Sequence, residues 1–274
     1  MIHIITSHHA TDFFLKPQLY YLKKYLKQDF KLWGYVDIPV EDKLKKEFHY
    51  ISEPPETFAP KEVFSGSQEE KLTYANGGGS LNAHWYKFNS LIYKVLNDPE
   101  TKDSDYLITM DGDAFPISPL DEYIDSTLKH YKFSAIQRLE NGFDIQPHSS
   151  FSFTTVGLFK EIKGTWSQGY QWSNTIFGCR TDVGGDMLQR LLMTRTLWYP
   201  LHRTNKNNPH PVFFGFYDNV IYHHGAGFRG RHKGYTVNNL KNMPQESLDR
   251  LEYYANLVEE HIETEREFKE FFLS

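Results

Sequence analysis

The stretch Asp105-Tyr106-Leu107-Ile108-Thr109-Met110-Asp111-Gly112-Asp113 joins an apolar run of strand length to two carboxylates one residue apart. Strands buried on both faces of a parallel sheet have nearly continuous apolar sequences, and ligands of open α/β sheets bind at the carboxyl ends of such strands. On extended backbone, residues i and i+2 point the same way, and Gly112 leaves room for a ligand near the main chain. A divalent cation bridging diphosphate oxygens would satisfy both carboxylates.

The same tripeptide pattern occurs a few residues earlier, in Asp103-Ser104-Asp105. That copy follows a polar segment with Pro99, which is typical of a turn. Only the second copy ends an apolar strand, so Asp111 and Asp113 are the candidate metal or phosphate ligands. The alternative is that they are turn or helix-capping carboxylates ahead of Ser118-Pro119.

The composition narrows the class of protein. A chain of 274 residues without a flexible linker is consistent with one α/β domain. The net charge of −5 and the pI near 6.2 offer no basic surface for nucleic acid, which is therefore not an expected partner. The single cysteine, Cys179, rules out an intramolecular disulfide and fits a cytoplasmic location. The sequence has no apolar run of about 18 residues, so we expect no transmembrane segment.

Hydrophobic periodicity predicts a mostly parallel central sheet flanked by helices over residues 1–240, followed by a helical tail over 241–274. A strand at 2–6, a helix at 14–25 and a strand at 31–36 form a βαβ unit, which implies parallel pairing. The Pro-, Gly- and charge-rich composition predicts a long loop over residues 52–80, either a disordered surface excursion or a lid over a site. We expect the tail to pack on the domain or to form a homodimer. Further predicted elements are helices at 81–96 and 184–193, a helix beginning at Ser118-Pro119, and strands at 105–110, 133–136, 151–156 and 220–224.

A second informative segment begins with His223-His224 and continues through Gly225 to Arg231. Imidazole binds Mn²⁺ and Zn²⁺ well, and Arg neutralises phosphate oxygens. Adjacent strand residues face opposite ways, so only one of the two histidines can share a cation with the aspartates. The alternative is an ordinary core histidine. A G-x-G-x-x-G from Gly225 to Gly230 lacks the βαβ context of a dinucleotide site.

Together, a first strand ending in Thr6-Ser7, an Asp-x-Asp after a central strand, and a late histidine followed by glycine and a basic residue resemble metal-dependent glycosyltransferases of the GT-A fold. The resemblance covers roughly residues 1–233. It implies a GT-A-like domain that binds Mn²⁺ or Mg²⁺ and a nucleoside-diphosphate sugar, such as a UDP- or GDP-sugar, and transfers the sugar to a carbohydrate or glycan acceptor. The implied metal ligands are Asp111, Asp113 and either His224 or His223, with His224 expected to contribute more.

The resemblance also implies roles for residues elsewhere in the chain. A carboxylate near the start of the 184–193 helix, Asp182 or Asp186, would be the catalytic base for the acceptor hydroxyl; the alternative is a helix cap and a first-turn acid. His148 and Trp172 are candidate acceptor contacts, although such residues more often belong to the core. The implied nucleotide-sugar contacts are Thr6, Ser7, Asp37, Lys87, Asp111, Arg229 and Arg231.

Two other functions fit parts of the pattern. A sugar-phosphate nucleotidyltransferase also uses paired carboxylates on an α/β sheet, but it usually has an early Gly-rich loop with Arg and Lys, which is absent after Thr6. A noncatalytic carbohydrate-binding protein with a decayed site is the third possibility, and the intact aspartates, histidines and arginines argue against it. The sequence does not define the donor base, the sugar, the acceptor or the stereochemistry.

Overall fold

The computed structural model describes residues 1–8, 12–36, 39–52, 80–175, 178–208, 210, 212–225 and 265–274. Its central element is a seven-stranded sheet in the order β10-β6-β7-β4-β1-β2-β3. Six strands run in one direction and β7 runs against them, because β7 pairs antiparallel with both β4 and β6. The predicted α/β architecture with a mostly parallel sheet is confirmed.

The elements follow the hydrophobic pattern closely in the first half of the chain. The strands of the large sheet are β1 (Ile2–His8), β2 (Phe30–Val36), β3 (Tyr50–Ser52), β4 (Tyr106–Asp111), β6 (Phe133–Ile136), β7 (His148–Thr155) and β10 (Trp198–Leu201). A smaller sheet in the order β11-β12-β5 contains β5 (Ala114–Pro116), β11 (Gly215–Tyr217) and β12 (Ile221–His223), and a hairpin contains β8 (Trp172–Asn174) and β9 (Gly178–Arg180). The helices are α1 (Leu15–Tyr25), α2 (Asp42–Lys45), α4 (Ser80–Asn97), α5 (Asp121–Leu128), α6 (Val156–Glu161) and α7 (Gly185–Met193).

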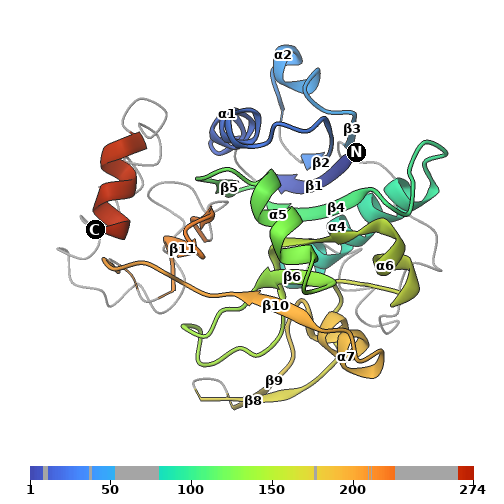
Figure 1. Cartoon of the computed structure of the whole chain (residues 1–274), viewed down its shortest axis with the longest axis vertical. Helices are drawn as coiled ribbons and strands as arrows, with labels where there is room; N and C mark the ends of the chain where they lie inside the picture. The colour runs from blue at the N-terminus through green and yellow to red at the C-terminus, as the bar shows by residue number, and fades with distance from the viewer. Residues whose placement is uncertain are drawn as a thin grey trace.

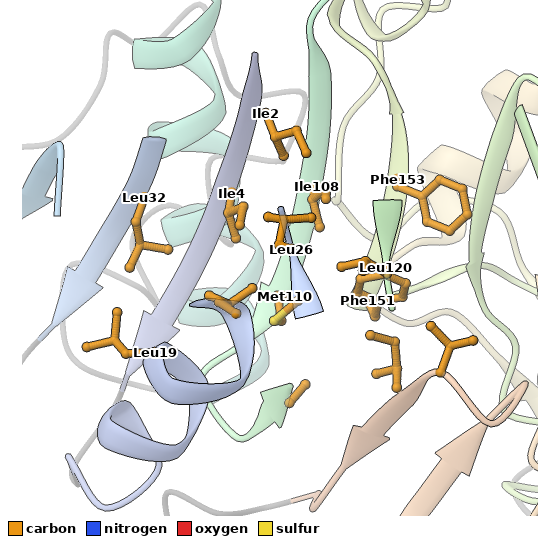
Figure 2. Close-up of a cluster of buried hydrophobic side chains, with 14 of the residues drawn as sticks. Ile2, Ile4, Leu19, Leu26, Leu32, Ile108, Met110, Leu120, Phe151 and Phe153 are labelled. Carbon is orange, nitrogen blue, oxygen red and sulfur yellow. The ribbon is translucent and has the colours of Figure 1, made fainter. Parts of the chain in front are cut away.

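Two hydrophobic layers cover the two faces of the large sheet. On one face, α1 and α5 pack against alternate residues of β1, β4 and β7, and Figure 2 shows Leu19 and Leu26 in the same cluster as Ile4 and Met110. On the other face, α4, α6 and α7 bury a second cluster that includes Phe88 and Leu107. Alternation along the strands assigns neighbouring residues to opposite layers, as period-2 geometry requires.

Residues 265–273 form a helix that lies beside the small sheet and is coloured red in Figure 1. Phe268 and Phe272 are fully buried against Phe216 of β11 and Tyr222 of β12. This segment of the predicted tail therefore packs on its own chain. The predicted domain boundary at residue 240 lies outside the described residues. The homodimer through the tail stays a prediction.

Polar contacts also join this helix to α1. Lys24 and Tyr25 of α1 donate hydrogen bonds to Glu265, and Lys269 reaches the same carboxylate at 2.6 Å. Although burial opposes ionisation, these hydrogen bonds hold the pKa of Glu265 at about 2. Among the described residues, no helix is long and apolar enough to cross a membrane.

Candidate metal centre

The Asp111-Gly112-Asp113 turn leaves β4 at the carboxyl end of the parallel strands. Its close fit against β1 requires a glycine, because a Cβ on Gly112 would lie 2.5 Å from the Ser7 carbonyl oxygen and 2.8 Å from His8 Nδ1. The Gly112 N–H donates to that same carbonyl at 3.1 Å. The turn is thus pressed against the end of β1, where Ser7 is the register partner of Asp111.

Gln18 of α1 holds both ends of this turn. Its Nε2 donates to the carbonyl oxygens of Asp111 at 2.8 Å and Ala114 at 2.7 Å, while its Oε1 accepts from Thr6 Oγ1 at 3.0 Å. His8 Nε2 lies 3.1 Å from the same Oε1, and burial lowers the pKa of His8 to about 4. The predicted nucleotide contact Thr6 is therefore part of the support for the turn. Gln18 was missed by the sequence analysis, because an amide on an amphipathic helix gives no distinctive signal.

His223 reaches the two carboxylates from the small sheet. In the β12–β5 pairing, His223 lies opposite Ala114, the residue after Asp113. Its Nε2 is 3.4 Å from Asp111 Oδ2 and 3.4 Å from Asp113 Oδ1. One ligand atom from each of the three residues lies within 4.8 Å of the others. The side chains of Asp111, Asp113 and His223 are 13%, 10% and 7% exposed, so the group is largely enclosed.

Electrostatic coupling within this group is strong. Burial opposes ionisation of Asp111, but His84 and His223 hold its pKa well below the ordinary value, and His223 likewise lowers the pKa of Asp113. Burial alone would lower the pKa of His223, but Asp113 and Asp111 raise it to about 9. A protonated His223 therefore supplies positive charge that the adjacent carboxylates need.

The donor set suits a divalent cation. Two carboxylates and one imidazole match the oxygen-rich coordination of Mn²⁺, with Mg²⁺ as the harder alternative. Asp111 Oδ1 is buried and makes no well-aligned hydrogen bond, although His84 Nε2 lies 3.0 Å away. A buried carboxylate oxygen without a proper hydrogen bond is the kind of atom that a cation satisfies. Asp111, Asp113 and His223 would hold the cation at this place.

His224 has a different environment from His223. Its ring packs between Phe14 and Phe214, with centroids 4.8 Å from each, and its Nδ1 lies 3.0 Å from the Tyr222 hydroxyl. Burial lowers the pKa of His224 to about 4, so the ring is neutral. It does not belong to the group of converging ligand atoms. The geometry favours His223 over His224, unlike our expectation that His224 contributes more, because the pairing with β5 turns His223 toward the aspartates. The metal ligands themselves stay a prediction.

Two further imidazoles border the centre. His84 of α4 lies 3.0 Å from Asp111 Oδ1 and 3.3 Å from Ser149 Oγ. The ring of His148, the first residue of β7, is 6.2 Å from that of His223. Burial, and then Arg138, lowers the pKa of His148 well below its ordinary value. His148 was predicted as an acceptor contact, whereas His84 was missed because helical periodicity alone does not show which helix residue reaches the turn.

The other predicted contacts belong to several different elements. Ser7 borders Asp111 at the end of β1, and Lys87 is buried with its Nζ 4.4 Å from the centroid of the Tyr35 ring. Trp172 is buried in the β8–β9 hairpin. The predicted contacts that lie outside the described residues are Asp37, Arg229 and Arg231.

The segment carrying Asp182 and Asp186 is fixed against the start of β7. Gly184 has φ +96°, and a Cβ there would lie 1.9 Å from the Pro147 carbonyl oxygen. Asp182 Oδ1 accepts from the N–H of Val183 at 2.8 Å and does not cap α7, whose N-cap is Gly184. Asp186 lies in the first turn, 3.2 Å from the Arg190 guanidinium. Since Pro147 precedes His148, the loop before α7 lies near the metal-centre edge of the sheet.

Comparisons with known proteins give distant similarities only. No protein-family model and no curated protein match this sequence. An active-site mutant of LgtC is 9% identical, covers 58% of this chain and 59% of its own, and has a TM-score of 0.35. The mannosyltransferase PcManGT from Pyrobaculum calidifontis, in complex with GDP-Man and Mn²⁺, is 8% identical. The match covers 94% of this chain and 69% of the mannosyltransferase, with a TM-score of 0.41. The galactosyltransferase LgtC with donor and acceptor sugar analogues is 8% identical, and the match covers 92% of this chain and 95% of LgtC, with a TM-score of 0.36. The chain thus spans 59% of the first of these, and similarities of this size do not bear on its activity.

The ligand set predicts a clear contrast between the two adjacent histidines. His223→Ala and Asp113→Asn should each weaken Mn²⁺ binding at least as much as losing an outer contact does in other metal sites, about 10–100-fold. His224→Ala should instead lower the free energy of unfolding by about 2–5 kcal/mol, as for other truncated core side chains, and leave Mn²⁺ affinity nearly unchanged. Mn²⁺ titration calorimetry and thermal unfolding of the three variants measure both effects. Loss of Mn²⁺ binding in His224→Ala alone would contradict this ligand set.

The raised pKa of His223 predicts pH-dependent metal binding. A cation needs the neutral imidazole, so binding must displace a proton below pH 9. Between pH 6.5 and 8.5, affinity should rise by about tenfold per pH unit for the one proton released. In the metal-free protein the folded pKa exceeds the unfolded one, so stability from His223 is present below about pH 6.5 and is lost toward pH 9. The difference in the free energy of unfolding between wild type and His223→Ala, measured across this pH range, isolates the contribution of His223 to stability. An Mn²⁺ affinity that does not change with pH would refute the predicted competition between proton and metal.

Proposed function

We propose that the chain is a metal-dependent glycosyltransferase of the GT-A type, which transfers a sugar from a nucleoside-diphosphate sugar to a carbohydrate acceptor. The observation that carries the proposal is the convergence of Asp111, Asp113 and His223 at the carboxyl edge of a mostly parallel sheet. Ligands of open α/β sheets bind at this edge, and the donor set suits a cation that holds phosphate oxygens.

The cation would stabilise negative charge on the departing diphosphate. The residues of the chain would bind and orient the donor around it. Ser7 borders the Asp111 turn, and Thr6 supports that turn through Gln18. Asp37 and Lys87 are proposed to contact the nucleoside, and Arg229 and Arg231 are proposed to neutralise the phosphates, as guanidinium groups do in many phosphate sites.

Acceptor activation is assigned to the loop before α7. Asp186 is buried in the first turn of the helix, and Asp182 lies two residues before Gly184, which packs against Pro147. Either carboxylate could remove the proton of an acceptor hydroxyl within hydrogen-bond reach. His148 and Trp172, from β7 and the β8–β9 hairpin, are the proposed acceptor contacts.

Donor binding is tested by thermal unfolding with a panel of nucleoside diphosphates and nucleotide sugars, with and without Mn²⁺. A ligand at one hundred times its dissociation constant adds about 2.7 kcal/mol to the free energy of unfolding. For a domain of this size the melting temperature should rise by roughly 5–10 °C, from about 2–4 °C per kcal/mol. The shift should require Mn²⁺ and should be absent in Asp113→Asn. If no nucleoside diphosphate shifts the wild-type transition with Mn²⁺ present, the proposed function is wrong.

The proposed base predicts a separation of binding from transfer. If Asp186 or Asp182 removes the acceptor proton, its change to Asn should leave donor affinity intact and reduce the transfer rate by about 10²–10⁴-fold. The other variant should change the free energy of unfolding by no more than about 1 kcal/mol, the usual effect of a local backbone contact. Donor affinity, melting temperature and transfer rate of Asp182→Asn and Asp186→Asn together identify the base. Normal transfer by both variants would place the base elsewhere or indicate a route without one.

A further inference from the structure

Arg138 stands beside the metal centre at the end of a neighbouring strand. It follows β6, whose last residue, Ile136, is the register partner of His148 at the start of β7. Since β4 and β6 both run against β7, the carboxyl end of β6 lies on the same edge of the sheet as Asp111. Arg138 Nη1 is 3.4 Å from His148 Nε2. The ring of His148 also lies 6.2 Å from the ring of His223, so it is a neighbour of both the guanidinium and the metal centre.

The guanidinium of Arg138 has no counterion among the described residues. No described carboxylate lies within the 4.0 Å limit of an ion pair, and the Arg138 Nε atom is buried without a hydrogen-bond partner. Glu140, the acid nearest in sequence, instead accepts from the Tyr217 hydroxyl at 2.6 Å. By contrast, Arg190 pairs with Asp186. A partly buried cation without a counterion costs free energy, and a bound anion would remove that cost.

Arg138 and His148 direct hydrogen-bond donors at the same place. The Ser150 N–H donates to His148 Nδ1 at 3.2 Å, and Ser150 Oγ lies 2.8 Å from the same atom and can also donate to it. In this tautomer the proton of the ring is on Nε2, the atom 3.4 Å from Arg138 Nη1. Two N–H donors cannot bond to each other. Each can donate to an oxygen atom that lies between or beside them, as in the sites where Arg holds carboxylate or phosphate.

Gln146 adds a third polar group without a partner. It is 1% exposed, and neither its Oε1 nor its Nε2 has a hydrogen-bond partner. It lies two residues before His148, and a Cβ on Gly184 would be 3.5 Å from its Cγ, which places it between β7 and the start of α7. Buried side-chain amides are normally hydrogen-bonded, so an unpartnered one on this edge is consistent with a ligand nearby.

We propose that Arg138 and His148, with Gln146 beside them, form a subsite for an anionic group of the substrate, either a carboxylate or a phosphate. The guanidinium and the imidazole N–H bind its oxygens, next to the cation that Asp111 would hold with its partners. The identity of the substrate rests on the proposed transferase function. The anionic group belongs either to the transferred sugar, as in a uronic acid, or to the acceptor, as in a sugar phosphate.

Matched ligand pairs test the subsite in the presence of Mn²⁺. In the first set, calorimetry compares a nucleoside-diphosphate hexose with the nucleoside-diphosphate hexuronate that carries the same base. In the second set, it compares glucose with glucose 6-phosphate and glucuronate, each with and without saturating nucleoside diphosphate. Wild type should prefer the acidic member of one set by about tenfold or more, the usual effect of a hydrogen bond to a charged group. Preference within the nucleotide sugars assigns the anion to the donor, and preference within the monosaccharides assigns it to the acceptor.

Two variants that each remove one positive charge show whether Arg138 causes the preference for the acidic ligand. Arg138→Gln should abolish it, while Arg195→Gln, at an exposed position, should keep it. Arg138→Lys, which retains the charge but loses the bidentate geometry, should keep part of it and serves if Arg138→Gln does not fold. Equal binding of neutral and acidic ligands by wild type, or an unchanged preference in the Arg138 variant that folds, overturns the proposal. The monosaccharide titrations without nucleotide give this result even if no nucleoside diphosphate binds, so failure of the subsite and failure of the proposed function are distinguishable.

Discussion

Two carboxylates fixed side by side at the end of a buried strand repel each other, and this edge of the sheet is organised around that repulsion. Gln18 clamps the backbone on both sides of the turn, and Gly112 allows the turn to press against β1, so the carboxylates cannot move apart. Positive charge must therefore come to them. In the metal-free chain the positive charge comes from His223, whose pKa is raised by the two carboxylates. A divalent cation would neutralise the carboxylates with a higher charge than the proton does. Because the cation needs the neutral imidazole of His223, proton and cation would compete for this ring.

The strand that carries His223 depends on packing far from the turn. On its other face, β12 presents Tyr222 to an aromatic cluster that includes Phe216, Phe268 and Phe272. His224 packs against aromatic rings of this cluster as a neutral ring, whereas His223 faces the two aspartates. Because the helix over 265–273 completes this cluster, the end of the chain supports the position of a residue in the metal centre.

The sequence predicted the parts of the structure that depend on local periodicity. The strand at 133–136 has the predicted bounds, and the helix predicted at 81–96 extends by one residue at each end. The strand predicted at 151–156 begins earlier, at His148, and Val156 instead starts α6. The small sheet was not predicted as a unit, because its strands have three residues each and pair across about one hundred positions of chain. That pairing turns His223 rather than His224 toward the aspartates, so the local pattern could predict that only one of the two histidines faces them but could not show which.

Charge balance also distinguishes the two sides of His148. On one side lie the carboxylates, which attract a cation; on the other lies Arg138, a cation without a described counterion. Burial keeps the ring of His148 neutral, so it separates these charges without adding one of its own. Once a divalent ion offsets the aspartates, their side is close to neutral, and the ion can still bind oxygen atoms of a ligand. A diphosphate-linked substrate with a second acidic group would fit this arrangement, because the ion would hold the diphosphate and Arg138 would hold the second acidic group.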